Sequence, residues 1–350
     1  FIFVISSIGT GAFNEFGYFL SARFLGGIAI GIASGLSPMY IAEVAPADVR
    51  GKLVTLNQLT IVIGILAAQV VNWRIAGTHT ESWNVSMGWR WMFWATAIPA
   101  VVFLVLSFLI PESPRFEVMK KRYGRAETTL SRIGGLEYAK AVTAAMMAAR
   151  SAEEKEENGG LELLLTKPFR GVLLLGVIIA FFQQWCGTNV IFNYAQEIFQ
   201  GAGYDVDNTF INIVITGIAN LVFTFVALFT VEKLGRRTLM LMGAGGLAGI
   251  YLVLGACYFF KASGIFMVIL CVCAIACYAM TLGPMTWVLI SEIFPNRVRA
   301  VAVATATFFL WVGSFTLTLS FPLLTGAMGT SGTFWIYSAI CFVALAYFVK

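Results

Sequence analysis

The chain has 350 residues, of which 59% are hydrophobic and only 12% are charged, and its formal net charge is +5. Charged residues make up about 25% of a soluble domain, so this composition and a mean hydropathy of +0.84 exclude a soluble protein and indicate an integral membrane protein. Cys273 and Cys277 share a helix face with no His or carboxylate nearby, so neither a metal site nor a cofactor is expected.

Uncharged runs predict the membrane-spanning helices, because a bilayer requires about 20 apolar residues in each. In chain order the runs are 1–14, 24–42, 53–73, 91–111, 171–196, 208–231, 238–260, 262–291 and 300–349. The last run is long enough for two helices with a break near 325–332. We therefore expect ten helices and an all-α membrane fold without strands.

Basic residues predict the orientation, because they accumulate in cytoplasmic loops. When successive loops alternate sides, one side receives Arg50, Lys52, Lys233, Arg236, Arg237, Arg297, Arg299 and Lys350. The other side receives Arg74, Arg90 and Lys261. The first side also holds the polar stretch from 111 to 168, so we expect this linker and both chain ends to be cytoplasmic. The net charge thus reflects topology and predicts no nucleic-acid partner.

An internal repeat predicts two homologous helical bundles. Glu43, Pro46 and Arg50 recur with the same spacing as Glu292, Pro295 and Arg299. The predicted domains are a partial N-terminal bundle of four spans (1–110), a linker with short helices (111–168) and a C-terminal bundle of six spans (169–350). Because the motif follows the fourth span of the second bundle but only the second span of the first, we expect ten of twelve helices, with the first two absent.

The repeat also predicts ion pairs that form when the cytoplasmic side closes. Its charged residues and those of the basic turn at 232–237 could pair between the bundles, at about 0–1 kcal/mol for each exposed pair. The residues are Glu43, Arg50, Glu232, Arg236, Glu292 and Arg299. The alternative is that they only follow the rule that places basic residues inside.

Four amides interrupt the fifth run. Gln183, Gln184, Asn189 and Asn193 would be costly in hydrocarbon unless they face partners or a water-filled cavity. Gly187 weakens the helix between them, and a break there could turn them toward one cavity. Because each amide offers donors and an acceptor, an uncharged cavity lined by amides suits a neutral ligand rich in hydroxyls. The alternative is that the amides bind neighbouring helices.

The chain resembles the sugar porter family of the major facilitator superfamily over essentially its whole length, and looks closest to the bacterial xylose–proton symporters. The motifs are RFLGGIAIG (23–31), SPMYIAEVAPADVRGK (37–52), NQLTIVIGI (57–65), PESPR (111–115), FQQWCGTNVIFNYAQEIF (182–199), VEKLGRR (231–237) and GPMTWVLISEIFP (283–295). The resemblance implies transport of a pentose or hexose by alternating access, with symported protons.

The resemblance also implies which residues do this. The substrate-binding residues would be Gln58, Gln183, Gln184, Asn189, Asn220 and Trp287. Asn193 is a further candidate because of its amide, although it stands where the family usually has a tyrosine. Tyr194 would belong to the outer gate and Arg23 to proton coupling, although Arg23 could instead extend to the outer interface. Leu310 and Ile65 replace polar residues of some xylose transporters, which leaves the identity of the sugar open.

Other functions remain as alternatives. They are facilitated diffusion of a sugar or of a polyol such as myo-inositol, and a sugar receptor that does not transport. An enzyme is not expected, because no acid, His or Cys cluster lies at membrane depth. We expect a monomeric multi-pass protein of the plasma (bacterial inner) membrane, in contact with lipid.

Overall fold

The computed structural model describes residues 1–46, 49–155, 164–201, 203, 206–262, 264–295 and 298–349, and every regular element in these ranges is a helix. Within these ranges, eight helical segments are long and apolar enough to cross a membrane. They cover Phe16–Ile41, Leu56–Gly77, Glu81–Ser107, Lys167–Asn193, Thr209–Thr230, Arg236–Phe259, Ile265–Ile290 and Val301–Val349. The prediction of an all-helical membrane protein is therefore confirmed.

The chain divides into two compact units, residues 1–57 with 74–159 and residues 58–73 with 160–350. The first unit contains α1 (Ile2–Ala12), α2 (Phe16–Val44), α4 (Glu81–Trp83), the π-helical turn η1 (Asn84–Gly88), α5 (Trp89–Ala95), α6 (Ala97–Ser107), α7 (Pro114–Met119) and α8 (Tyr123–Lys155). Helix α3 (Arg50–Gly77) contributes to both units. The division into three domains at 110 and 168 stays a prediction.

Close contacts join the first helices of the chain. Ser6 Oγ donates a hydrogen bond to the carbonyl of Ala22, at 2.7 Å, where α1 packs on α2. Arg90 of α5 donates to the carbonyl of Gly11 at the end of α1, at 2.9 Å, and a cation suits the negative end of a helix dipole. A polar side chain thereby satisfies a carbonyl that the end of α1 would otherwise leave without a partner.

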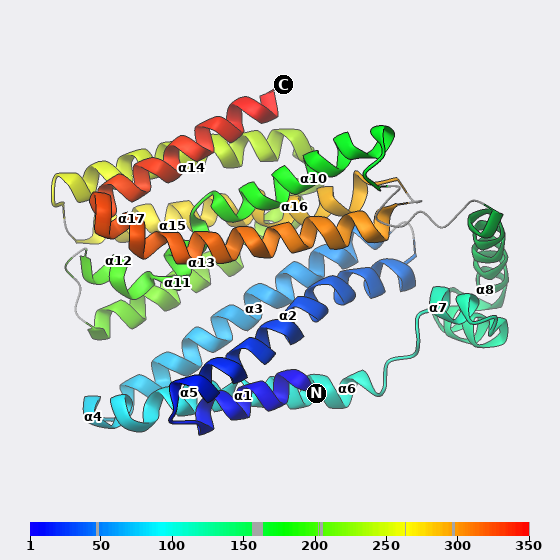
Figure 1. Ribbon diagram of the computed structural model, residues 1–350, viewed down its shortest axis with the longest axis horizontal. Coiled ribbons are helices and arrows are strands. Elements are labelled where there is room, and N and C mark those ends of the chain that lie inside the picture. Colours follow the sequence, from blue (N-terminus) through cyan, green and yellow to red (C-terminus); the bar gives the residue numbers. More distant parts are fainter. Residues whose placement is uncertain are drawn as a thin grey trace. The chain divides into compact units, whose positions relative to one another are not determined.

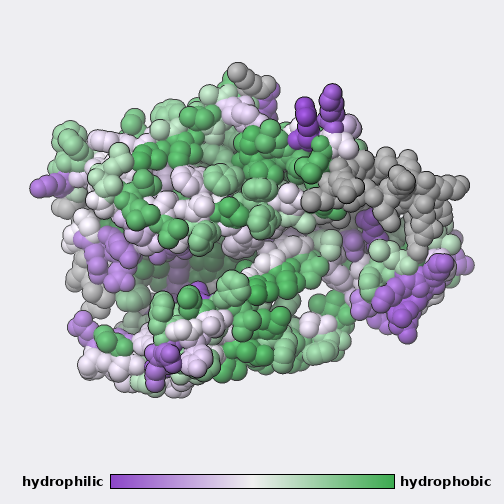
Figure 2. Space-filling model, viewed as in Figure 1, coloured by the Kyte–Doolittle hydropathy of each residue, from purple (hydrophilic) through white to green (hydrophobic). Residues whose placement is uncertain are grey.

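The segment that follows α6 is tied to the end of α2. Tyr40 Oη donates to the carbonyl of Pro111, at 2.8 Å, and Ser113 Oγ donates to the Glu43 carboxylate. Helices α7 and α8 then form the polar part of this unit, where hydrophilic side chains gather in Figure 2. The two hydrogen bonds fix the start of the linker to the first copy of the repeat motif.

The second unit holds α10 (Lys167–Trp185), α11 (Thr188–Asn193), α12 (Ala195–Gly201), α13 (Val206–Leu234), α14 (Arg236–Phe259), α15 (Ile265–Met280), α16 (Leu282–Glu292) and α17 (Arg299–Val349). Figure 1 shows α17 lying along α10 and α14. The fully buried rings of Tyr251, Phe334 and Tyr337 pack together between α14 and α17. Helix α17 is broken at Gly329, which has a φ of 73°, so the break expected near 325–332 is confirmed.

The helices differ from the uncharged runs mainly at their ends. Helix α2 begins at Phe16 rather than 24 and α3 begins at Arg50 rather than 53, because charged side chains at a helix end can reach water or headgroups. The fourth run is interrupted where α5 ends at Ala95. Pro99 explains this end, because its ring would clash with the carbonyl four residues earlier.

Candidate substrate site

The chain turns sharply between α10 and α11 at Gly187. This residue has a φ of 87°, in the left-handed region that glycine adopts without a Cβ penalty. The backbone stays paired around the turn, because the Cys186 amide donates to the Phe182 carbonyl at 2.8 Å and the Val190 amide to the Gly187 carbonyl at 3.1 Å. The predicted break at Gly187 is confirmed, and it leaves the backbone N–H groups of Cys186 and Val190 hydrogen-bonded.

The turn brings three amide side chains into one chain of hydrogen bonds. Asn189 Nδ2 donates to Gln184 Oε1, and Gln184 Nε2 donates to Gln183 Oε1 at 2.7 Å. In an unbroken helix Gln184 and Asn189 would lie about 140° apart and could not meet. Gln183 and Gln184 are only 4% and 6% exposed, so these amides are inside the protein and do not face lipid.

The chain of amides ends on a tyrosine of another helix. Gln183 Nε2 donates to Tyr278 Oη at 2.6 Å, across from α10 to α15. The sequence analysis did not identify Tyr278. A signal was present, because a buried Tyr hydroxyl usually has a hydrogen-bond partner and Tyr278 lies in an otherwise apolar run. Its partner could not be read from the sequence, since Gln183 is 95 residues away.

Helix α17 lies against the same stretch of α10 and α11. A Cβ on Gly313 would be 3.4 Å from Gln184 Cβ, so this glycine permits the close approach. Beyond the amides, Asn193 Nδ2 lies 3.4 Å from Thr318 Oγ1, and Tyr194 Oη donates to the Thr318 carbonyl at 2.8 Å. Asn193 is exposed and bonded to α17, so it is not part of the amide chain described above.

The remaining candidate binding residues belong to the same compact unit but lie outside this hydrogen-bonded chain. Gln58 is half-buried in α3, and Asn220 is 5% exposed in α13. Trp287 is half-buried in α16 and packs against a cluster that includes Ile290 and Leu310. Helix α16 starts after a break at Thr281, close to Gly283 and Pro284, two residue types that weaken a helix.

Of the predicted ion-pair residues, Arg236 and Glu292 are paired, with Nη2 and Oε1 3.2 Å apart. Both belong to the second unit, and both are about half exposed. Arg299 Nε instead donates to the Phe294 carbonyl at 3.1 Å. Glu43 accepts the hydrogen bond from Ser113. The side chains of the other two predicted residues, Arg50 and Glu232, lie outside the part of the chain that is described.

Arg23 is exposed on α2, with its guanidinium carbon 5.3 Å from the centre of the Phe93 ring. This contact is a cation–π interaction, which stabilises a cation at an apolar surface by about 0.5–1 kcal/mol. The contact is compatible with either reading of Arg23, because a stacked guanidinium keeps its charge.

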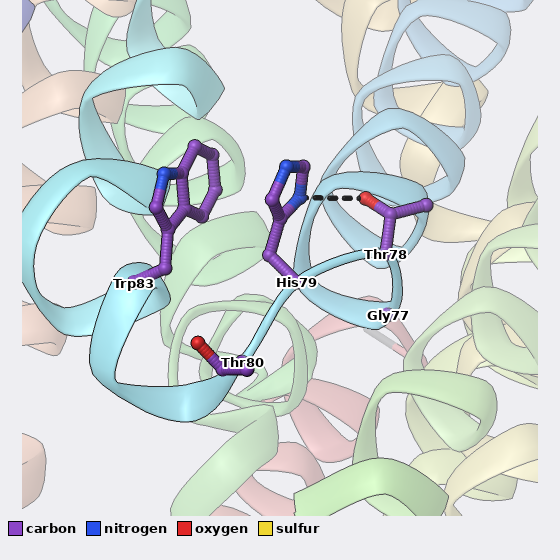
Figure 3. A pocket seen from close by; sticks show the side chains of 5 residues that line it. All are labelled: Gly77, Thr78, His79, Thr80 and Trp83. Atoms are coloured by element: carbon purple, nitrogen blue, oxygen red, sulfur yellow. Dashed lines mark hydrogen bonds between the residues drawn. The ribbon is translucent and has the colours of Figure 1, made fainter.

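An open hollow of about 410 Å³ lies in the loop after α3 and is lined by Gly77, Thr78, His79, Thr80 and Trp83. Figure 3 shows the His79 ring stacked on Trp83, at 3.8 Å between centroids, with Thr78 bonded to His79 on the other side. No predicted site residue lines this hollow. Because all of its lining residues belong to the end of α3, the loop after it and α4, the hollow does not include the hydrogen-bonded amides.

Within the described ranges the chain has eight apolar helical segments long enough to cross a membrane, and uncharged, hydrogen-bonded amides lie inside one of them. Together with the solved structures reported below, this defines the class as a multi-pass membrane transporter. The whole chain, residues 1–350, matches the family described as "Sugar (and other) transporter". The chain belongs to this family, the sugar porters of the major facilitator superfamily.

Individual relatives agree with this assignment. The chain is 38% identical over 338 residues to the D-xylose-proton symporter of Escherichia coli K12, covering 95% of this chain and 68% of the relative. It is 34% identical to the arabinose-proton symporter of Bacillus subtilis, covering 98% and 74%. It is 32% identical to the glucose facilitated diffusion protein of Zymomonas mobilis, covering 97% and 71%.

Solved structures show the same fold. The proton:xylose symporter XylE bound to 6-bromo-6-deoxy-D-glucose superposes with a TM-score of 0.86 at 34% identity, covering 99% of this chain and 77% of that one. The inward open XylE from Escherichia coli superposes with a TM-score of 0.82, also at 34% identity, covering 100% and 77%. The chain is thus a multi-pass transporter of the type found in the bacterial inner membrane.

Proposed function

We propose that the protein carries a monosaccharide, a pentose or hexose, across the membrane by alternating access. The observation that supports this most strongly is the buried chain from Asn189 through Gln184 to Gln183 at a helix break. The hydrogen bonds that join the amides leave further N–H groups and lone pairs to bind the hydroxyls of a sugar. No charge has to be removed from water for such binding, which suits a neutral ligand.

The other candidate residues would complete the site. Gln58 and Asn220 would add amides from α3 and α13, and Asn193 would add one nearer Tyr194, the proposed outer gate. Trp287 would supply a flat apolar surface for the C–H face of a sugar, and it is only half-buried, which leaves part of its surface free. A buried polar group that loses its partner costs about 1–3 kcal/mol, so such a site rejects ligands that lack hydroxyls.

We further propose that transport is coupled to protons. Relatives named as D-xylose-proton and arabinose-proton symporters support this, whereas the relative named as a glucose facilitated diffusion protein supports the alternative. Coupling needs a group that changes charge during the cycle. Arg23 would act near that group, since a fixed cation favours the ionised state of a neighbouring carboxylate.

The finer architecture belongs to the same proposal. We propose ten membrane crossings of a twelve-helix plan, counting α1 as one crossing and α17 as two because of its break at Gly329. The linker and both ends of the chain would be cytoplasmic, and the protein would work as a monomer in contact with lipid. The Arg236–Glu292 pair would then lie on the cytoplasmic side, where breaking it helps that side to open.

Uptake measurements test the site. Radiolabelled xylose and glucose uptake is measured in cells that express the protein from its complete open reading frame, with Gln184→Ala and Trp287→Ala as variants. Gln200→Ala is the matched control, because Gln200 is an exposed amide near the end of α12. We expect uptake to fall about five- to thirty-fold in the two site variants, since each loses a bond or an apolar contact worth about 1–2 kcal/mol. Normal uptake in both would refute the site.

A pH electrode tests the coupling. Protons that enter cells together with sugar leave an unbuffered medium more alkaline, so symport predicts an alkaline shift when the transported sugar is added. An uncoupler should abolish the shift. Sugar uptake without any shift would instead establish facilitated diffusion.

A further inference from the structure

A strongly basic stretch lies near the start of the linker. Residues 115–125, RFEVMKKRYGR, contain five basic residues and one acidic residue. The acidic residue, Glu117, is only 3% exposed. Its Oε2 lies 3.9 Å from Arg122 Nη1 and its Oε1 lies 4.0 Å from Arg125 Nη1, so two cations already face this carboxylate. Glu117 therefore does not neutralise the outer side of the stretch.

Lys121 occupies a backbone position at which glycine is the common residue. Its φ is 60°, in the left-handed region where a residue with a Cβ is strained. The Lys121 amide donates to the Val118 carbonyl at 3.0 Å. The Arg122 amide donates to the Glu117 carbonyl at 2.8 Å. These two bonds form the turn that ends many helices, usually with glycine at this position. The backbone alone would favour glycine, so the charge of the lysine is the feature that glycine could not supply.

This stretch begins at the end of a membrane span. The apolar span Phe16–Ile41 ends at the residue after Tyr40, whose hydroxyl donates to the Pro111 carbonyl at 2.8 Å. Helix α7 starts shortly after Pro111, at Pro114. An extended chain of this length reaches about 10 Å at most, so α7 starts at the depth of the lipid headgroups.

Two large apolar side chains lie on the exposed face of α7. Phe116 and Met119 are 37% and 61% exposed, and their spacing places them on one face of the helix. Lys120 Nζ lies 4.5 Å from the centre of the Phe116 ring, so a cation lies beside this apolar face. In the described part of the chain, neither Lys120 nor Lys121 forms an ion pair, and both are exposed. Cations beside exposed apolar side chains are typical of helices that lie on a membrane surface.

We propose that the exposed face of α7 and the turn that ends it bind the headgroup of an anionic phospholipid, through Phe116, Met119, Lys120 and Lys121. The two lysines bind the phosphate, and the two apolar side chains enter the boundary between headgroups and acyl chains. The inference concerns the lipid around the protein, so it does not depend on which molecule the protein carries.

The test measures lipid binding to the purified protein, expressed from its complete open reading frame, by native mass spectrometry in a nonionic detergent. The probes are phosphatidylglycerol and phosphatidylcholine. We expect the unmodified protein to bind its first phosphatidylglycerol at least about five-fold more tightly than phosphatidylcholine. Lys121→Gly should weaken phosphatidylglycerol binding about five-fold, since one lysine near the headgroups contributes about 1 kcal/mol. Because glycine suits the left-handed turn, the midpoint of thermal unfolding should not fall, and misfolding would not explain the lost affinity.

Lys261→Gly is the matched control. Lys261 has a φ of 54°, and its amide donates to the Tyr258 carbonyl at 3.2 Å in the same kind of turn, at the end of α14. The charged residues nearest to it in the sequence are Arg237 and Glu292, so it has no neighbouring cation in the sequence to help hold a phosphate. Its replacement should change the affinity for the first phosphatidylglycerol by less than about two-fold.

Three results would overturn the inference. They are equal affinities of the unmodified protein for the two lipids, a Lys121→Gly variant that keeps its affinity for phosphatidylglycerol, and displacement of the lipid by an equal concentration of inorganic phosphate. The last result would show that the surface recognises free phosphate and no lipid. Lipid binding is measured without sugar, so a failure of sugar uptake would refute the proposed function and leave this inference standing.

Discussion

The turn at Gly187 should be the most sensitive backbone position of the candidate site. Alanine there would have to hold a φ of 87°, which costs about 1–2 kcal/mol for a residue with a Cβ. Its methyl group would also lie 2.9 Å from the Tyr337 ring. Crowding of this kind in a packed core costs about 1–3 kcal/mol. Gly187→Ala should therefore destabilise the protein by about 2–5 kcal/mol.

The assay is equilibrium unfolding in mixed micelles by an ionic detergent, followed by tryptophan fluorescence. Gly249→Ala is the matched control, because Gly249 lies in α14 and a Cβ there would meet nothing within 4 Å. The control should be neutral or more stable by about 0.4–1 kcal/mol, since alanine restricts the unfolded chain. Equal unfolding free energies for the unmodified protein and Gly187→Ala would refute the reasoning.

A double-mutant cycle with Tyr337→Ala separates the two contributions. Removing the ring relieves the crowding but leaves the backbone strain, so the two substitutions should be coupled by about 1–3 kcal/mol. Additive effects of the two substitutions would show that the Tyr337 ring does not crowd the added methyl group. Sugar uptake should fall with Gly187→Ala in either background, because Asn189 reaches Gln184 only through this turn.

Two further predictions concern helix packing and the surface ion pair. Gly26→Ala should destabilise the protein by about 1–3 kcal/mol in the same unfolding assay, because its methyl group would meet the Ser6 hydroxyl that bonds to α2. The adjacent Gly27→Ala is the control and should be neutral, since its methyl group would meet nothing within 4 Å; equal effects of the two substitutions would contradict the packing of α1 on α2. Arg236→Glu should lower the midpoint of thermal unfolding slightly, since an exposed ion pair is worth about 0–1 kcal/mol. Adding Glu292→Arg should restore the midpoint, and both effects should vanish in concentrated salt. A large effect that resists salt would show that the pair is screened from water.

The features that could be predicted from the sequence are those set by neighbouring residues. Hydropathy defined the spans, because the bilayer requires long apolar helices whatever their partners are. The break at Gly187 could be predicted, since a glycine among four amides in an uncharged run weakens a helix at a place where continuity would separate Gln184 from Asn189. The break at Gly329 followed in the same way from a run too long for one crossing. The helix ends could not be placed so well, because charged end residues can lie on either side of the membrane boundary.

The partners of the predicted charges were harder to infer. Arg236 of the basic turn and Glu292 of the repeat were predicted to pair between the bundles, and they are paired, but within the second unit. The same pattern did not show that Arg299 would bond to the Phe294 carbonyl five residues away. A guanidinium can satisfy its donors on a nearby carbonyl or on a distant carboxylate, and the spacing along the chain does not distinguish the two.

Tyr278 shows that only some of the polar residues at the centre of a transporter can be identified from its sequence. Amides in an apolar run attract notice because their burial is costly, so Gln183, Gln184 and Asn189 could be identified residue by residue. A tyrosine in such a run is a weaker signal, since its ring suits the bilayer and its hydroxyl needs only one partner. Yet that hydroxyl accepts the last bond of the chain and so joins the amides of α10 to a second helix. Residue types in the sequence therefore predict that a neutral hydroxylated ligand can bind, whereas the partner of each amide depends on contacts between helices that only the fold provides.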